Sequence, residues 1–106
     1  MKINIYNPDT DTISTQGEIL IPRGGSFGMA LLKDGNILVY GGINEARSGP
    51  FMGTVYENRL EIFNPKTGKS QLLNKRHSTY LYSATLLDDG RLFFISANGY
   101  ELFEIK

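Results

Sequence analysis

Cysteine is missing from this sequence, and so is tryptophan. Without cysteine the chain has no disulfides, no thiolate metal ligands and no cysteine nucleophile, so nothing in its fold depends on the redox compartment. An excess of one charge is also missing, because 11 Lys and Arg residues balance 11 Asp and Glu residues. Binding to nucleic acid or to an anionic membrane needs a concentrated basic face, so the sequence predicts neither partner.

Long hydrophobic runs are missing as well. Residues 1–8 hold no apolar segment of signal-peptide length, and no run approaches the length of a membrane span. We therefore expect a cytoplasmic protein. With 106 residues, of which 41% are hydrophobic, the chain is expected to form one globular unit.

Helical periodicity is also missing. No segment of helix length repeats its apolar residues every three to four positions, as an amphipathic helix would. Short apolar or alternating segments instead lie between turn residues. The dipeptides Asp34-Gly35, Asp89-Gly90 and Asn98-Gly99 each separate two apolar segments. Because Asp-Gly and Asn-Gly tolerate positive φ best, these sites predict β-hairpins with type I′ turns.

Two other turns share a different chemistry. Both 7–11 and 64–68 begin with Asn-Pro, and their fifth residues are Asp11 and Gly68. Proline presets φ at the first central position of such a turn, and we expect the fifth residue to adopt the left-handed conformation.

The turn signals belong to an internal repeat. Segment 29–38 matches segment 84–93, 55 residues later, and segment 3–8 matches segment 60–65, 57 residues later. Residues 100–103 repeat the second pattern without its Asn-Pro. A repeat of roughly 50 residues that contains several strands is typical of propeller blades.

The first unit resembles a kelch repeat, in the style of bacterial and galactose-oxidase-like members of that family. It has Arg23 before its first strand, the Asp34-Gly35 turn, the pair Gly41-Gly42 after its second strand and the turn 64–68 after its third. The resemblance covers nearly the whole chain. The second unit departs from the pattern, because residues 94–97 replace the double glycine, and both units lack the usual tryptophan of the fourth strand.

The resemblance implies an all-β fold with two four-stranded antiparallel propeller blades per chain. Nine strands are expected, labelled a to d from the inside of a blade outward. They are c and d at 2–6 and 12–20, a to d at 26–32, 36–40, 59–63 and 69–73, and a to c at 80–87, 91–96 and 100–105. Repeat 1 then covers about 23–74. Repeat 2 covers about 76–106 and is completed by about 2–20 of the same or a neighbouring chain.

Two blades are too few to close a propeller, which uses about 4 to 8. Open blade faces and unpaired strand edges are association surfaces. We therefore expect a homo-oligomer, with a trimer of six blades as the central hypothesis. Partnership with other propeller fragments and departure from propeller geometry are the alternatives. Strand 12–20 could complete a neighbour's last blade, and segments 2–6 and 100–105 would then compete for its third position.

Arg23 and Arg76 occupy equivalent places before the first strands of the two repeats. In kelch proteins such arginines lie near the rim of the central channel. The resemblance therefore implies an Arg-lined mouth that binds a small anionic ligand or a protein with an acidic segment. His77 and Tyr80, which follow Arg76, are further candidate binding residues. The structural alternative is that each arginine bonds backbone carbonyls and packs between blades.

Segment 43–58 is the second candidate site. The second repeat joins its strands b and c through a tight turn, whereas the first repeat uses this long loop with Arg47, Phe51 and Met52. These side chains could anchor a partner protein, contact a neighbouring subunit, fold back on the protomer or belong to a flexible loop.

Catalytic signals are sparse. His77 is the only histidine, and no Gly-x-Ser-x-Gly elbow accompanies it, so a hydrolytic triad is not predicted. The copper chemistry of galactose oxidase needs a cysteine and a second histidine. The aspartate pairs 9/11 and 88/89 lack the spacing of a calcium loop and predict turns. We expect no metal and no cofactor.

We therefore expect a non-enzymatic binding module. One alternative is an enzyme, a carbohydrate isomerase or hydrolase, that uses Arg76, His77 and Tyr80 or Tyr82 from several chains at a shared channel. The other alternative is a structural fragment that assembles with a larger propeller.

Overall fold

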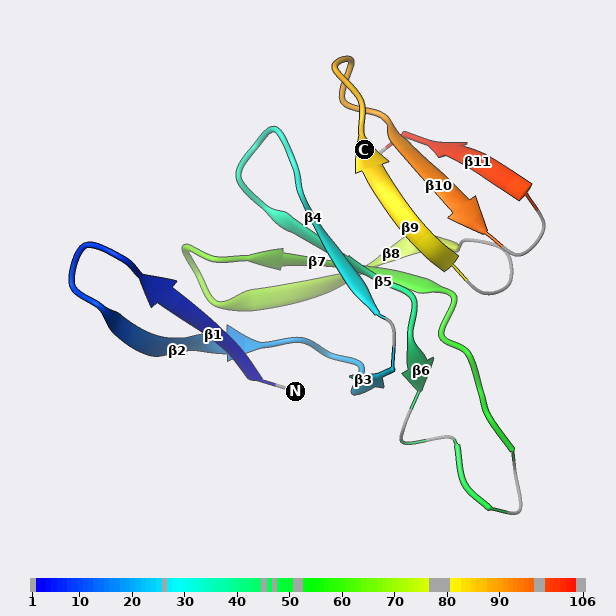
Figure 1. The fold of residues 1–106 in the computed structure, drawn as a ribbon, viewed down its shortest axis with the longest axis horizontal. Coiled ribbons are helices and arrows are strands. Elements are labelled where there is room, and N and C mark those ends of the chain that lie inside the picture. The colour runs from blue at the N-terminus through cyan, green and yellow to red at the C-terminus, as the bar shows by residue number, and fades with distance from the viewer. Residues whose placement is uncertain are drawn as a thin grey trace.

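The computed structural model describes residues 2–25, 27–44, 46, 48–50, 53–76, 81–96 and 99–104. For residues 74–76, 81, 82 and 103 only the backbone is described. In this part of the chain the regular elements are all β-strands, joined by turns and loops (Figure 1). The predicted all-β class is confirmed. The described residues include no helix that is long and apolar enough to cross a membrane.

The strands form four small antiparallel sheets. The N-terminal hairpin pairs β1 (Lys2–Asn7) with β2 (Thr12–Glu18). The central sheet contains β4 (Gly28–Leu31), β5 (Ile37–Tyr40), β7 (Arg59–Asn64) and β8 (Lys69–Arg76), in that spatial order. The C-terminal sheet contains β9 (Leu81–Leu86), β10 (Leu92–Ser96) and β11 (Gly99–Phe103). A short ladder pairs β3 (Arg23–Gly24) with β6 (Ile43–Asn44). Each of the nine expected strands overlaps one of these elements.

The type I′ prediction is wrong for the two Asp-Gly turns. Gly35 and Gly90 have positive φ values of 89° and 90°, but neither preceding aspartate does. Each glycine N–H donates to the carbonyl three residues earlier, in Leu32 and Leu87. This pattern is a type I turn followed by a left-handed glycine, the usual three-residue hairpin loop. The aspartate favours it because its carboxylate accepts the backbone N–H two residues later, at 2.9 Å for Asp34 and 3.0 Å for Asp89. The third predicted turn includes Asn98, which lies outside the described residues.

The Asn-Pro turns behave as predicted. Asp11 and Gly68 have φ values of 52° and 73°, both in the left-handed region. In each turn the asparagine side chain accepts the backbone N–H two residues later, at 3.0 Å for Asn7 and 2.9 Å for Asn64. The same local chemistry therefore ends β1 and β7.

The core lies on both faces of the central sheet. Leu38, Tyr40 and Leu60 on one face pack against Leu92 and Phe94 of the C-terminal sheet. On the opposite face, Val39 and Phe63 pack with Ile19, which follows the N-terminal hairpin. The central sheet therefore lies between the other two units, and the described strands form no closed ring (Figure 1).

Candidate functional site

Arg23 lies at the end of the central sheet where β5 stops and the 43–58 segment begins. Its side chain is 1% exposed. One guanidinium nitrogen donates to the Gly41 carbonyl at 3.0 Å, and another donates to the Arg59 carbonyl at 2.9 Å and lies 3.5 Å from the Glu61 carboxylate. Burial lowers the pKa of Arg23, and the nearby carboxylates of Glu61 and Glu57 oppose that shift. Arg23 thus has the contacts of the structural alternative.

The Glu61 carboxylate holds the chain segment that leads into β3. It accepts the backbone N–H groups of Leu20 and Ile21, the latter at 3.3 Å. Glu61 is 0% exposed. A buried carboxylate is stable only when charges and donors compensate for its lost hydration, and Arg23 together with the two amides supplies them.

A second ionic network stands beside the first and fixes the base of the 43–58 segment. The Glu57 carboxylate accepts hydrogen bonds from the Arg59 guanidinium and from the Asn44 amide, all at 2.9 Å. It also accepts the Arg59 backbone N–H at 2.8 Å. Burial alone raises the pKa of Glu57, but these hydrogen bonds outweigh it and lower the pKa from its ordinary 4.5 to about 2. The carboxylate is therefore ionised under ordinary conditions.

Hydrogen bonds connect the described residues of segment 43–58 near its base. The Asn44 N–H donates to the Val55 carbonyl at 2.8 Å, and the Val55 N–H donates to the Ser48 hydroxyl at 2.9 Å. Gly49 and Gly53 exchange backbone hydrogen bonds farther out. The segment forms an arm that projects from the end of the central sheet (Figure 1). An open cavity of about 380 Å³ lies between its base and the glycines that follow Arg23.

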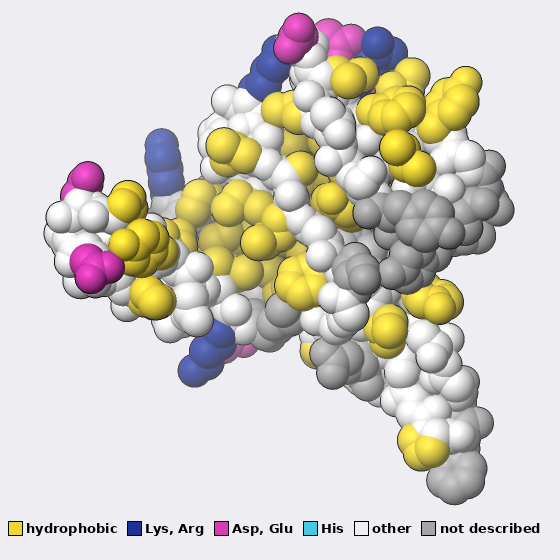
Figure 2. Space-filling view, viewed as in Figure 1, with side chains coloured by type: hydrophobic (Ala, Val, Ile, Leu, Met, Phe, Trp, Pro, Cys, Tyr) yellow, Lys and Arg dark blue, Asp and Glu magenta, His cyan; other side chains and the backbone are white. Residues whose placement is uncertain are grey.

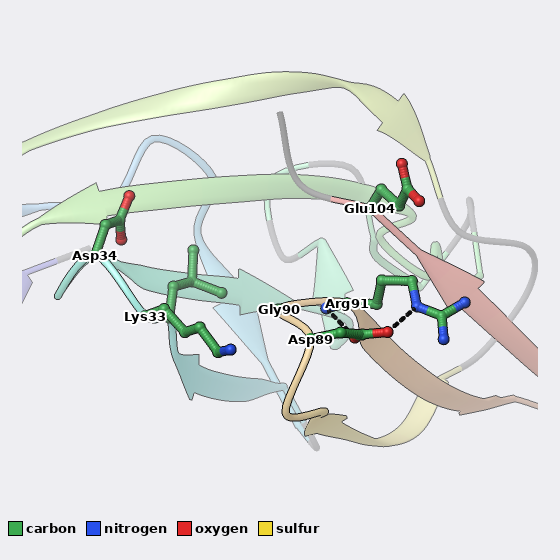
Figure 3. A pocket seen from close by; sticks show the side chains of 7 residues that line it. Lys33, Asp34, Asp89, Gly90, Arg91 and Glu104 are labelled. Atoms are coloured by element: carbon green, nitrogen blue, oxygen red, sulfur yellow. Dashed lines mark hydrogen bonds and ion pairs between the residues drawn. The ribbon is translucent and has the colours of Figure 1, made fainter.

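A larger cleft lies at the opposite end of the sheets, between the two equivalent Asp-Gly turns. Its volume is about 600 Å³. Its charged lining residues are Lys33, Asp34, Asp89, Arg91 and Glu104 (Figure 3). The Arg91 guanidinium bonds the Asp89 carboxylate at 2.7 Å, and the Lys33 ammonium donates to the Asp88 carbonyl.

Sequence analysis missed this cleft, because the two turns are 55 residues apart in the chain and only the packing of the sheets brings them together. The repeated Asp-Gly turns were the available signal. Both positive and negative side chains line the cleft, so its charge favours no one class of ligand.

The other predicted site residues are largely beyond what the structure describes. The backbone of Arg76 pairs with that of Arg59 at the end of β8, and its side chain is not described. Arg47, Phe51, Met52, His77 and Tyr80 lie outside the described residues. The roles predicted for these residues therefore stay predictions.

In the described part of the chain, no three His, Cys, Asp or Glu side chains group so that they could hold a metal ion. The arrangement of Arg23, Glu57, Arg59 and Glu61 is one of mutually compensated charges that fix backbone segments. No protein-family model matches the sequence, and no curated protein matches it.

Proposed function

We propose that this protein is a non-enzymatic interaction module made of two kelch-like blades, which further copies of the chain complete into a closed β-propeller. A trimer remains the central hypothesis for the assembly. The proposed ligand is a protein or a small anionic molecule, bound where the 43–58 arm projects from the sheet.

The observation that carries this proposal is the repetition of strand register between the central and C-terminal sheets. In the central sheet, Leu38 pairs with Ile62 and Val39 with Glu61. In the C-terminal sheet, the residues at the same repeat positions pair in the same way, Phe93 with Leu102 and Phe94 with Glu101. The two units thus share turn chemistry, strand order and register, as successive blades of one propeller do.

The arm is the proposed binding element, because two ionic networks connect its base to the central sheet. Arg23 donates to the Gly41 carbonyl just before the arm, and Glu57 accepts hydrogen bonds from Arg59 where the arm ends. A rigid scaffold that carries a projecting loop is a common way to present binding residues. Because the Arg23 guanidinium is engaged in the interior, we assign the anion-binding role to Arg47 and Arg76, with Phe51 and Met52 as apolar anchors.

Two probes test the anionic part of the proposal: a decaglutamate peptide and inorganic phosphate, titrated by isothermal titration calorimetry at low and raised salt. We expect at least one of them to bind, and more weakly at raised salt. Arg47→Ala with Arg76→Ala should weaken that binding by about tenfold or more.

The matched control is Arg91→Ala, which removes a partly exposed arginine at the opposite end of the sheets. It should leave the affinity unchanged. Failure of both probes to bind the wild type, or equal losses in the control and the double variant, contradicts an anion site at the arm.

The alternative of a structural fragment draws on the exposed apolar faces of the central and C-terminal sheets, where Met29, Leu31 and Ile95 are 45% to 67% exposed, because such faces accept another propeller fragment as well as a second copy. Light scattering distinguishes the two assemblies. A chain that stays monomeric alone and co-elutes only with a kelch-bearing protein is a fragment of a larger propeller.

A further inference from the structure

The repeat assigns each residue of the central sheet a counterpart in the C-terminal sheet, 55 positions later. On one side, here called the forward face, Leu38 and Tyr40 correspond to Phe93 and Ile95. On the other side, called the rear face, Met29 and Leu31 correspond to Ala84 and Leu86. Cross-strand pairing confirms these sides, because Leu38 pairs with Ala30, Val39 with Met29 and Phe94 with Ala84.

Within the chain, the forward face of the central sheet packs on the rear face of the C-terminal sheet. Leu38 and Tyr40 are 0% and 7% exposed, and Ala84 and Leu86 pack against their cluster. The Tyr40 ring lies 5.6 Å from the Phe94 ring. This interface is therefore a forward-to-rear contact between two successive sheets.

The counterpart positions lie on the forward face of the C-terminal sheet and on the rear face of the central sheet, here called the two free faces. These positions are apolar but exposed to solvent. On the free forward face, Ile95 is 45% exposed, Phe93 is half-buried, and the adjacent β11 adds Tyr100 and Leu102 at 72% and 50%. Met29 and Leu31 on the free rear face are 55% and 67% exposed. Contiguous apolar groups of this kind mark association sites.

The N-terminal hairpin covers only part of the free rear face. Ile3 and Ile19 pack over Val39 and Phe63, whereas Leu31 remains open. Figure 2 shows hydrophobic side chains gathered between the hairpin and the C-terminal sheet, and a second group over the C-terminal sheet. The part of the rear face that remains exposed to solvent is therefore the part over β4 and β5.

We propose that a second copy of this chain covers the exposed part of the rear face. The forward face of its C-terminal sheet, at Phe93 and Ile95, packs on the rear face of the central sheet, at Met29 and Leu31. The contact repeats the forward-to-rear interface already present within one chain, with β9 and β10 of the neighbour over β4 and β5. This proposal rests on the oligomeric part of the proposed function and names the surfaces that meet. The neighbour's β11 and the local β1 then compete for the third strand position of one blade, as the sequence predicts for segments 100–105 and 2–6.

Such a contact is heterologous, since it joins two different faces of identical chains, and it generates a ring or an open chain of copies. This property makes the proposal testable. Leu31→Glu disrupts only the rear face, and Ile95→Glu disrupts only the forward face. Two glutamates repel each other wherever the two altered faces meet. Both residues are solvent-exposed within one chain, so both variants should fold, which circular dichroism and thermal unfolding check.

Size exclusion coupled to light scattering should show the wild type as an oligomer, and each variant alone as a monomer of 11.8 kDa. In a mixture of the two variants, the unaltered forward face of the Leu31 variant can still pack on the unaltered rear face of the Ile95 variant. The mixture should therefore form dimers of about 24 kDa, twice the mass of the 11.8 kDa chain, and nothing larger. Tyr56→Ser is the matched control, because Tyr56 is 52% exposed on the 43–58 arm, and it should leave the oligomer intact.

Two outcomes overturn the proposal in distinguishable ways. A wild-type oligomer that Leu31→Glu leaves intact, or variants that stay monomeric when mixed, would show that copies meet through other faces, and the proposed assembly would survive. A wild type that is monomeric at every concentration would remove the interface and the self-assembled propeller together. The calorimetric test of the arm is independent of either result.

Discussion

At the scale of single residues, two buried carboxylates organise the end of the central sheet that carries the arm. Glu61 binds the incoming segment through the Leu20 and Ile21 amides, and Glu57 binds the returning segment through Arg59. Each carboxylate faces an arginine, so neither charge is left uncompensated in the interior. By contrast, the Asp89–Arg91 pair at the other end is about half exposed. Pairs of that kind contribute little to stability.

We predict that the protein loses stability on acidification because of Glu57. Its folded-state pKa, about 2, lies below the ordinary 4.5, so its contribution is fully present above pH 4.5 and is lost as the pH falls toward 2. The loss attributable to this group is on the order of 3 kcal/mol. Urea unfolding between pH 6 and pH 2 measures it.

The Glu57→Gln variant should be less stable than the wild type at pH 6 and should lose less stability on acidification. Glu18→Gln, which changes an exposed carboxylate in β2, is the control and should keep the pH dependence of the wild type. Parallel stability curves for wild type and Glu57→Gln would mean that the pKa of Glu57 is not lowered by folding.

At the scale of elements, local turn chemistry and close glycine contacts set how the strands meet. Both Asp-Gly turns and both Asn-Pro turns repeat their hydrogen bonds in the two halves of the chain. Gly28 pairs with Tyr40 across the β4–β5 ladder, and the Tyr40 ring lies over it. The missing side chain of Gly28 therefore creates the space in which the ring reaches Phe94.

Gly28→Ala is predicted to destabilise the central sheet. A Cβ at this position would lie 2.5 Å from the Tyr40 Cζ and Oη atoms, and the buried ring cannot turn away without leaving Phe94. We expect a loss of about 1–3 kcal/mol in the free energy of unfolding, as for other overpacked cores. Gly49→Ala is the control because a Cβ there meets nothing within 4 Å. Urea denaturation of both variants checks this, and equal midpoints would contradict the steric account.

At the scale of the whole molecule, burial is uneven along the stack of sheets. Leu38, Val39, Leu60 and Phe63 of the central sheet are 0% exposed because both faces of β5 and β7 are covered. Most of β2 is exposed, and so are Tyr100 and Leu102 in β11. The molecule is best packed at its centre and most open at its two ends.

Hydrogen exchange should follow this gradient. We expect the amides of β5 and β7 to exchange slowest in dilute native solution, because their exposure requires opening of both apolar clusters. The amides of β2 should exchange first, through local opening of the hairpin. Exchange measured by nuclear magnetic resonance tests the order, and protection of the hairpin equal to that of β5 would show that the sheets open as one cooperative unit.

The strands and turns could be located from the sequence, because alternation of apolar residues and the φ preferences of Gly, Asn, Asp and Pro act over a few neighbouring residues. The sequence was insufficient for the type of the Asp-Gly turns, where the aspartate side chain bonds the backbone two residues later. The burial of Arg23 against Gly41, Arg59 and Glu61 became evident only in the folded molecule. The same holds for the charged cleft between two turns that are distant in the chain. Those outcomes depend on contacts between residues 18 to 55 positions apart, which packing of the sheets creates and which no local pattern encodes.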